Sequence, residues 1–168
     1  MEEVVGSEEA ERRAVDAALN FLSYRQRTSW EVRRKLGARG FGQGTIDAAM
    51  ARLSAVGLVD DEAFVGAYVR DRIVHRPMGV RRMIQELYAK GVAREVASRV
   101  IDAVLREEET SERELVMRVV AKKRRTLVRR SEDAALSRRR LRDQLLRRGF
   151  DTRVVREAID ELLPRAEE

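Results

Sequence analysis

Apolar residues recur along most of this chain at intervals of three or four positions, the spacing that places them on one face of a helix. No stretch alternates apolar and polar residues with the period of two that is typical of a strand. The pattern therefore predicts an all-α protein. We expect nine helices, over about residues 9–27, 28–38, 43–56, 60–75, 80–90, 93–106, 112–127, 130–149 and 152–164.

Residues that cap helices support several of these boundaries. Thr28 followed by Glu31 predicts a capping box, in which each side chain accepts a hydrogen bond from the other residue's backbone N–H group. Asp60 and Asp61 come after a turn at Gly57, and we expect this pair to cap the helix that follows. The remaining cap candidates are Thr110 or Ser111, Ser131 with its neighbours, and Asp151 with Thr152. Residues 1–8 are acidic and are expected to fray.

The helical spacing also predicts which residues face inward. In the first helix they are Val15, Ala18, Leu19 and Leu22; in the central pair of helices they are Phe64, Ala67, Tyr68 and Ile73, then Val80, Met83, Ile84 and Leu87.

One helical phrase occurs three times in the chain. An apolar residue, a Leu four positions later and a Gly four positions after that recur as Val32-Leu36-Gly40, Met83-Leu87-Gly91 and Leu141-Leu145-Gly149, each followed by Phe41, Val92 or Phe150. Each Gly is expected to end its helix in the left-handed conformation. An apolar residue follows thirteen positions after each Gly, at Leu53, Val104 and Leu162. We therefore predict three tandem three-helix repeats, over residues 9–57, 58–108 and 110–164, stacked into an elongated, curved array with a long concave face.

The charge distribution points to an anionic partner. The net charge is +6, and most of the positive residues are Arg, which a GC-rich genome explains about as well as function does. Such codon use does not explain clustering: residues 113–156 hold sixteen Arg or Lys and only five Asp or Glu. The candidate partner-binding residues are Arg25, Arg27, Arg33, Arg34, Arg70, Arg72, Arg81, Arg82, Lys122, Lys123, Arg124, Arg125, Arg139 and Arg142.

Some of these residues flank the repeated phrase. Arg33 and Arg34, Arg81 and Arg82, and Arg142 stand next to its first apolar residue, so stacked repeats are expected to align them along one edge. Because Arg holds carboxylate or phosphate with two parallel hydrogen bonds, such an edge suits a polyanion or the acidic wall of a filament.

The sequence offers no catalytic or metal-binding constellation. There is no Cys, and His75 is the only His. Asp60 and Asp61 are adjacent at a helix start, so they point in different directions; capping is a better explanation than a metal or acid–base pair. The carboxylates of residues 107–109, 112 and 114 fit a solvated linker. The glycines of residues 40–44 lack the Lys of a phosphate-binding loop. Trp30 and Phe41 could each stack on nucleic-acid bases or fill the hydrophobic core, and core filling is favoured for Phe41.

The sequence also predicts the cellular location. No apolar run reaches the roughly 18 residues that span a bilayer, and the N-terminus is not typical of a secretory signal. We expect a cytoplasmic monomer without a cofactor.

The quoted motifs resemble the RecX family, the regulators of the bacterial recombinase RecA. In the centre the resemblance rests on residues 57–61, Phe64, Tyr68, Arg72, Gly79, Glu86, Leu87 and residues 90–92, where Val92 replaces a frequent Ile. In the first repeat it rests on Leu22, Arg25, residues 27–29, Glu31, Leu36 and Gly40, and in the third on residues 147–150. It covers about residues 14–163.

The resemblance implies binding in the groove of the RecA–DNA filament on single-stranded DNA. Filament growth, strand exchange, ATP hydrolysis and stimulated repressor self-cleavage would then be inhibited. The family motif is architectural and implies no catalytic residue, so the protein is not expected to be an enzyme. Whether it also binds bare DNA weakly is open. The alternatives are a general DNA-binding protein, since three-helix units resemble helix-turn-helix modules, and a nuclease, for which the residues give no support.

Overall fold

The computed structural model describes residues 2–130 and 134–162, without the side chains of residues 2–6, 124–130 and 134. This part of the chain is helical and contains no strand. Its helices are α1 (Glu2–Leu22), α2 (Ser29–Gly37), α3 (Gln43–Ala55), α4 (Asp61–Val74), α5 (Val80–Tyr88), α6 (Arg94–Glu107), α7 (Glu112–Arg130), α8 (Ala134–Arg147) and α9 (Thr152–Leu162).

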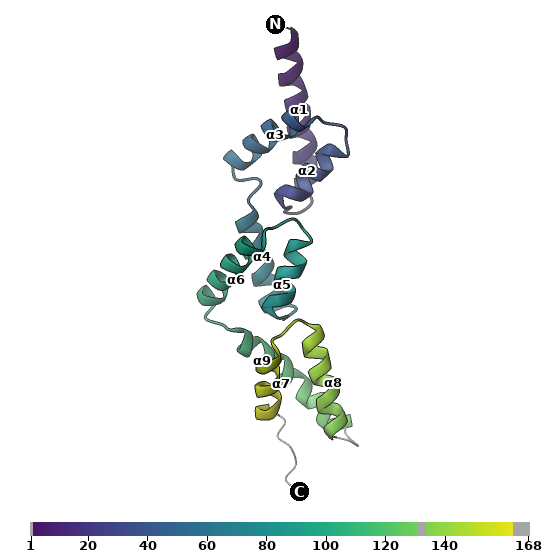
Figure 1. Cartoon of the computed structure of the whole chain (residues 1–168), viewed down its shortest axis with the longest axis vertical. Coiled ribbons are helices and arrows are strands. Elements are labelled where there is room, and N and C mark those ends of the chain that lie inside the picture. The colour runs from purple at the N-terminus through teal and green to yellow at the C-terminus, as the bar shows by residue number, and fades with distance from the viewer. Residues whose placement is uncertain (1, 131–133, 163–168) are drawn as a thin grey trace.

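The helices form three units that follow one another along the long axis of the molecule (Figure 1). The first unit is α1–α3, the second α4–α6 and the third α7–α9. In each unit the first and third helices make the most extensive contact, and the second helix lies beside them. The predicted all-α array of stacked three-helix repeats is thereby confirmed.

The repeated phrase supplies the core of each unit. Leu36, Leu87 and Leu145 are all 0 % exposed. The first unit has a hydrophobic core of its own, whereas the cores of the second and third units merge into one continuous cluster. The second and third units therefore form one hydrophobic body, to which the first unit is joined by the polar contacts described below.

Most predicted caps are observed. Thr28 and Glu31 form the predicted capping box at the start of α2. The Asp60 side chain accepts a hydrogen bond from the Ala63 N–H group, as a local N-cap does. At the start of α7, Ser111 accepts a hydrogen bond from the Glu114 N–H group and donates its own N–H to the Glu114 carboxylate. Local sequence alone determines these helix starts.

The C-terminal glycines and the last cap also match. Gly40, Gly91 and Gly149 have φ angles of +84°, +82° and +79°, the predicted left-handed conformation. Asp151 accepts hydrogen bonds from the N–H groups of residues 153 and 154 and so caps α9.

Several details differ from prediction. Helix α1 begins at Glu2 and ends at Leu22, because the chain then turns and Ser23 donates a hydrogen bond to the Asn20 carbonyl oxygen. Leu19 is 39 % exposed and Ala67 is also exposed, so neither faces the core. Helix α7 continues to Arg130 rather than ending near residue 127. The predicted helix start at residues 130–133 and the end at Pro164 fall largely or wholly outside the described residues.

Candidate binding surface: the joints between units and a cationic groove

The first and second units meet where the start of α2 contacts the end of α5. The Thr28 hydroxyl donates a hydrogen bond to the Lys90 carbonyl oxygen at 2.6 Å. Asp61, the first residue of α4, accepts hydrogen bonds from the Ser29 N–H group at 2.7 Å and from the Ser29 hydroxyl at 2.6 Å. Asp61 was expected to cap its own helix; that prediction is wrong, because its carboxylate instead caps α2 in the neighbouring unit.

Gly91 allows the two units to approach closely at this joint. A Cβ atom built on Gly91 would lie 2.2 Å from the Trp30 Cβ and 2.3 Å from the Trp30 Cγ. No side chain fits in that space, and the positive φ of Gly91 disfavours one independently. Trp30 itself is 42 % exposed, so one part of it seals the joint while another part meets solvent.

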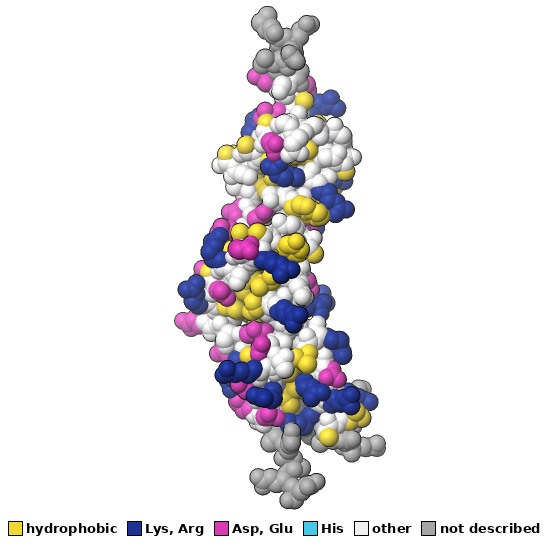
Figure 2. Space-filling view, viewed as in Figure 1, with side chains coloured by type: hydrophobic (Ala, Val, Ile, Leu, Met, Phe, Trp, Pro, Cys, Tyr) yellow, Lys and Arg dark blue, Asp and Glu magenta, His cyan; other side chains and the backbone are white. Residues whose placement is uncertain are grey.

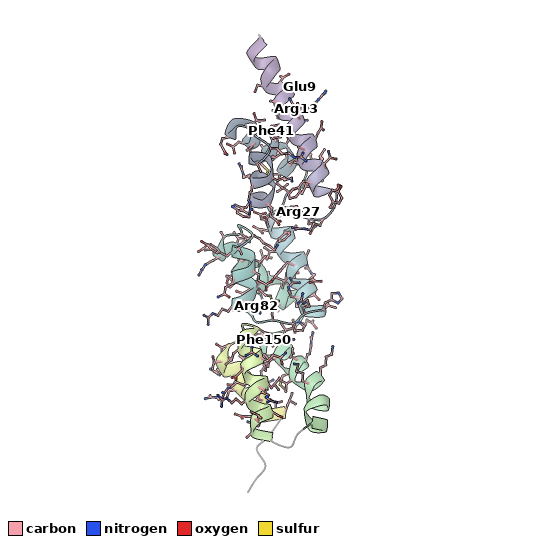
Figure 3. The ribbon with its side chains drawn as sticks, turned by 90° about the vertical axis from the view of Figure 1, so that its right-hand side faces the viewer. Glu9, Arg13, Arg27, Phe41, Arg82 and Phe150 are labelled. Carbon is pink, nitrogen blue, oxygen red and sulfur yellow. The ribbon has the colours of Figure 1, made fainter. Side chains whose placement is uncertain are left out.

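The second and third units are joined in the same way. The Gly79 N–H group, just before α5, donates a hydrogen bond to the Arg148 carbonyl oxygen at 3.0 Å. The Arg82 guanidinium donates to the Arg147 carbonyl oxygen at 2.9 Å. A Cβ on Gly149 would lie 2.4 Å from the Arg82 Cβ. Figure 3 shows Arg82 and Phe150 on the two sides of this joint.

The two joints use equivalent positions of the repeat. Aligned on the repeated phrase, Thr28 corresponds to Gly79 and Lys90 corresponds to Arg148. The carboxylate is repeated as well: Glu112, the first residue of α7, accepts a hydrogen bond from the Val80 N–H group, as Asp61 does from the corresponding group of α2. Burial raises the pKa of Glu112, although its hydrogen bonds from backbone N–H groups act in the opposite direction. One kind of joint therefore builds the whole array.

A groove of about 930 Å³ opens at the joint between the second and third units. Its apolar floor includes Ile73, Met78 and Val119. Among the described residues, six cationic side chains and no Asp or Glu line it: Arg76, Arg82, Arg118, Lys122, Lys123 and Arg148. The loop after α4, the start of α5, the middle of α7 and the residue after α8 contribute these residues.

The charges around the groove are poorly compensated. Of the six cations, Arg82 is the one for which an ion pair is recorded among the described residues, with Glu86. Arg118 donates to the Thr110 hydroxyl at 3.3 Å and Arg148 to the Pro77 carbonyl oxygen at 3.4 Å, both neutral acceptors. Burial lowers the pKa of Lys123, and the nearby Arg148 charge lowers it further. Such a site attracts anionic groups, because an arriving carboxylate or phosphate relieves the mutual repulsion of the cations.

Two family models match the chain in the regions of the first two units. The model of the RecX first three-helix domain matches residues 14–53, and that of the RecX second three-helix domain matches residues 60–101. A regulatory protein RecX from Prosthecochloris aestuarii is 32 % identical over 152 residues, which cover 90 % of this chain and 95 % of that protein. The chain belongs to the RecX family of regulatory proteins.

Other RecX proteins agree with this assignment. A regulatory protein RecX from Mycobacterium avium is 32 % identical over 153 residues, covering 91 % of this chain and 85 % of the relative. The crystal structure of RecX from Lactobacillus salivarius has the same fold, with a TM-score of 0.76 at 23 % identity over 92 % of this chain and 97 % of that one. The family is one of regulatory proteins rather than enzymes.

Most of the arginines predicted as partner-binding in this RecX-family chain have acidic neighbours. The pairs are Arg25 with Glu31, Arg27 with Glu31, Arg33 with Asp47, Arg70 with Glu107 and Glu108, Arg72 with Asp71 and Glu86, Arg82 with Glu86, and Arg142 with Asp143. Figure 2 shows the same mixture, with acidic and basic side chains interspersed along the visible face. A net positive field is therefore local rather than continuous along the array.

The arginines that were predicted to line one edge do not stand at equivalent positions of the repeat. Arg33 and Arg142 follow the first apolar residue of the repeated phrase, whereas Arg81 and Arg82 precede it, so they do not occupy the same position. Arg82 belongs to a joint. Arg34 lies over the Trp30 ring, 5.2 Å from its centroid.

The remaining predicted residues divide into three groups. Lys122 and Lys123 line the groove. Arg81 and Arg139 are exposed, and no ion pair is recorded for either among the described residues. The side chains of Arg124 and Arg125 lie outside the described residues. Prediction from the sequence missed Arg76, Arg118 and Arg148 as members of one site, because only the stacking of the units brings them together.

Arg72 contacts other residues of the second unit. It lies 4.3 Å from the centroid of the Tyr68 ring, and the Tyr68 hydroxyl donates a hydrogen bond to Glu86 at 2.7 Å. Burial and the hydrogen bond to Glu86 raise the pKa of Tyr68 to about 12. These three residues belong to the motif that carries the family resemblance, and they tie α4 to α5 inside the second unit.

The described part of the chain contains no group of three or more His, Asp or Glu residues that could hold a metal ion. None of its helices is long and apolar enough to cross a membrane.

Proposed function

We propose that this RecX-family chain binds the filament that RecA forms on single-stranded DNA in the cytoplasm and inhibits it. Filament growth, ATP hydrolysis, strand exchange and the stimulation of repressor self-cleavage are the activities that fall. The chain acts as a monomer and without a cofactor. Family membership supports the choice of partner, and the observation that carries the proposed mode of binding is the cationic groove between the second and third units.

The shape of the molecule suits an extended target. An array of stacked units presents a long surface to its partner, and a filament offers equally spaced copies of the same surface. The groove gathers six cations, and among the described residues Arg82 is the one of them with an ion pair. We therefore assign it the main electrostatic contact with the filament, and binding weakens as salt screens that contact.

General DNA binding is the second candidate, because six cations also suit a phosphate backbone. The lining of the groove argues for a weaker interaction with bare single strands. Its described residues include no Phe, Tyr or Trp, the residues on which unpaired bases stack. We therefore propose that the groove prefers the filament, where protein carboxylates and phosphates are both available.

The test measures inhibition of RecA filaments at substoichiometric amounts of this protein. The wild type should lower both ATP hydrolysis and strand exchange. Arg118→Glu combined with Lys122→Glu should raise the concentration for half-inhibition by about tenfold or more, equivalent to about 1.4 kcal/mol of binding. Arg153→Glu with Arg156→Glu on α9 changes the net charge equally outside the groove and should inhibit normally.

Far-UV circular dichroism checks that both double variants keep their helical content. Unchanged ATP hydrolysis and strand exchange with the wild type would contradict the proposed function. Equal loss of inhibition in the two double variants would contradict the assignment to the groove, since net charge alone would then explain the binding.

A further inference from the structure

The joint that connects the units is left open at one end of the array. In the first unit, Gly40 occupies the position of Gly91 and Gly149 and has the same left-handed conformation, with φ +84°. Gly91 is covered by Trp30 and Gly149 by Arg82, but a Cβ on Gly40 would meet no heavy atom within 4 Å. The surface that receives a helix twice within the chain is therefore not covered by any described residue here.

The acceptor groups of the open joint are also free. Lys90 and Arg148 use their carbonyl oxygens to accept the hydrogen bonds that hold the units together. The equivalent carbonyl is that of Arg39, and no described residue is recorded as donating to it or to the carbonyl of Ala38. The carbonyl oxygens of Arg34, Leu36 and Gly37 accept hydrogen bonds from residues 38–41, so the carbonyls of residues 38 and 39 are the acceptors left at this end of α2 among the described residues.

The apolar residue after the glycine shows the same contrast. Val92 and Phe150 are buried, at 2 % and 4 % exposed. Phe41, their equivalent, is only partly buried against the core of the first unit. Figure 3 shows Phe41 at the end of this unit that faces away from the second, with Arg27 at the opposite end.

The carboxylate of the joint has a counterpart as well. Asp61 and Glu112 begin α4 and α7, and the equivalent position in α1 is Ala10, between Glu9 and Glu11. Glu11 pairs with Arg52 at 3.3 Å. Glu9 is mainly exposed, 3.7 Å from Arg12, and Figure 3 shows it on the part of α1 that extends beyond Phe41. A carboxylate whose recorded ion pair is with an exposed residue of its own helix therefore stands near the open end.

We infer that this open end, formed by Glu9, Arg39, Gly40 and Phe41, binds the first turn of an α-helix of a protein partner. The two closed joints specify the chemistry of that turn. It carries Thr, Ser or Gly at the N-cap, which donates to the Arg39 carbonyl oxygen as Thr28 and Gly79 donate in the closed joints. Its free N–H groups and positive dipole suit the Glu9 carboxylate and the end of α2.

The occupant is a different protein rather than a second copy of this chain. Helices α2 and α5 start at equivalent positions, Ser29 and Val80. The next equivalent is Arg138, but α8 has already begun at Ala134, so it lacks the helix start that fits the joint. Resting on the proposed function, we assign the incoming helix to a RecA protomer of the filament.

A side chain placed in the open joint tests this inference. Gly40→Asn keeps the left-handed conformation, which Asn tolerates, and fills the space that a partner helix needs. Gly57→Asn is the matched control, because Gly57 has φ +68°, also meets no heavy atom within 4 Å and lies outside the open end. Binding of each full-length variant to RecA filaments on fluorescent single-stranded DNA gives the dissociation constants. We expect Gly40→Asn to weaken binding at least about fivefold and Gly57→Asn to leave it unchanged.

Photo-crosslinking identifies the occupant. A photoreactive phenylalanine derivative replaces Arg39 in the full chain, and mass spectrometry maps its crosslinks in the presence of filament. Crosslinks to the first turn of a RecA helix support the inference. Crosslinks confined to DNA, to a RecA loop or to a second copy of this chain overturn it, as does an absence of crosslinks.

The outcomes separate the two proposals. If the wild type inhibits the filament and Gly40→Asn binds as well as the wild type, the inference fails while the proposed function stands. If the wild type neither binds nor inhibits the filament, the proposed function fails, and the assignment of the helix to RecA fails with it.

Discussion

Replacing Gly91 by Ala tests whether the close joint between units stabilises the fold. An Ala in the left-handed conformation costs about 1 kcal/mol anywhere in the chain. At Gly91 the new Cβ would also lie 2.2 Å from the Trp30 Cβ. A change of rotamer cannot move a Cβ atom away, so the two units must separate by about 1.3–1.8 Å to restore an ordinary carbon–carbon contact.

Separation of the units breaks the polar contacts of the joint. Three hydrogen bonds are at risk: Thr28 to Lys90 at 2.6 Å, and the two from Ser29 to Asp61 at 2.6 and 2.7 Å. Each contributes about 1 kcal/mol net. We therefore expect Gly91→Ala to lower the free energy of unfolding by about 3–4 kcal/mol, a large share of the about 5–15 kcal/mol of a typical domain.

Gly40→Ala is the matched control for this prediction. Gly40 has φ +84°, and nothing lies within 4 Å of its built Cβ, so the conformational cost alone remains. Urea unfolding followed by far-UV circular dichroism should give a loss of about 1 kcal/mol for this variant. Equal losses for Gly40→Ala and Gly91→Ala would refute the close joint between the first and second units.

Three further predictions concern single side chains. Asp61→Ala should cost about 2 kcal/mol in urea unfolding, because it leaves two donors of the neighbouring unit unpaired, whereas Asp60→Ala should cost about 1 kcal/mol as a local cap. Burial alone would raise the pKa of Glu31, but hydrogen bonds from the Arg25 side chain and a backbone N–H group hold it below its ordinary value. The ionised carboxylate therefore stabilises the fold above about pH 4.5, the unfolded pKa, and this contribution disappears as the pH falls through the lower folded pKa. Glu31→Gln should be less stable than the wild type at pH 7 by about 1–2 kcal/mol, and this difference should shrink as the pH falls below 4.5; a difference that does not change with pH would exclude this linkage. Tyr68→Phe should lower stability by about 1 kcal/mol, and ultraviolet titration of the wild type should find one phenol ionising only near pH 12, which the variant lacks.

Local features of the structure could be predicted from the sequence. The capping box at Thr28, the cap at Asp60 and the left-handed Gly91 depend on residues within one turn of each other, so their chemistry can be recognised without knowing the fold. The repeated phrase then gave the number and kind of units, because each unit buries the same Leu.

Contacts between units could not be predicted in this way. Asp61 looked like a cap for its own helix, and its true partner is Ser29 in another unit. Arg82 looked like a free surface cation, but it closes a joint through the Arg147 carbonyl oxygen. Reversing the charge of Arg82 would therefore perturb structure as well as binding, and Arg81 is the better single probe of that surface.

The groove illustrates the same limit. Arg76, Arg118 and Arg148 are far apart in sequence, and each resembles an ordinary solvated arginine. They converge because the loop after α4, the middle of α7 and the residue after α8 meet at the joint between the second and third units. The basic stretch from Arg113 to Arg156 was the one indication of this site in the sequence. It pointed to the third unit, which forms one side of the groove, without identifying the groove itself.

A competition between filament and bare DNA tests the central claim most directly. RecA filament on single-stranded DNA and an equal amount of differently labelled bare single strand are mixed with the protein at about 0.15 M salt. The account predicts that the protein binds mainly to the filament and that ATP hydrolysis falls at a substoichiometric amount of protein. Equal or greater binding to the bare strand, with ATP hydrolysis unchanged, would contradict it.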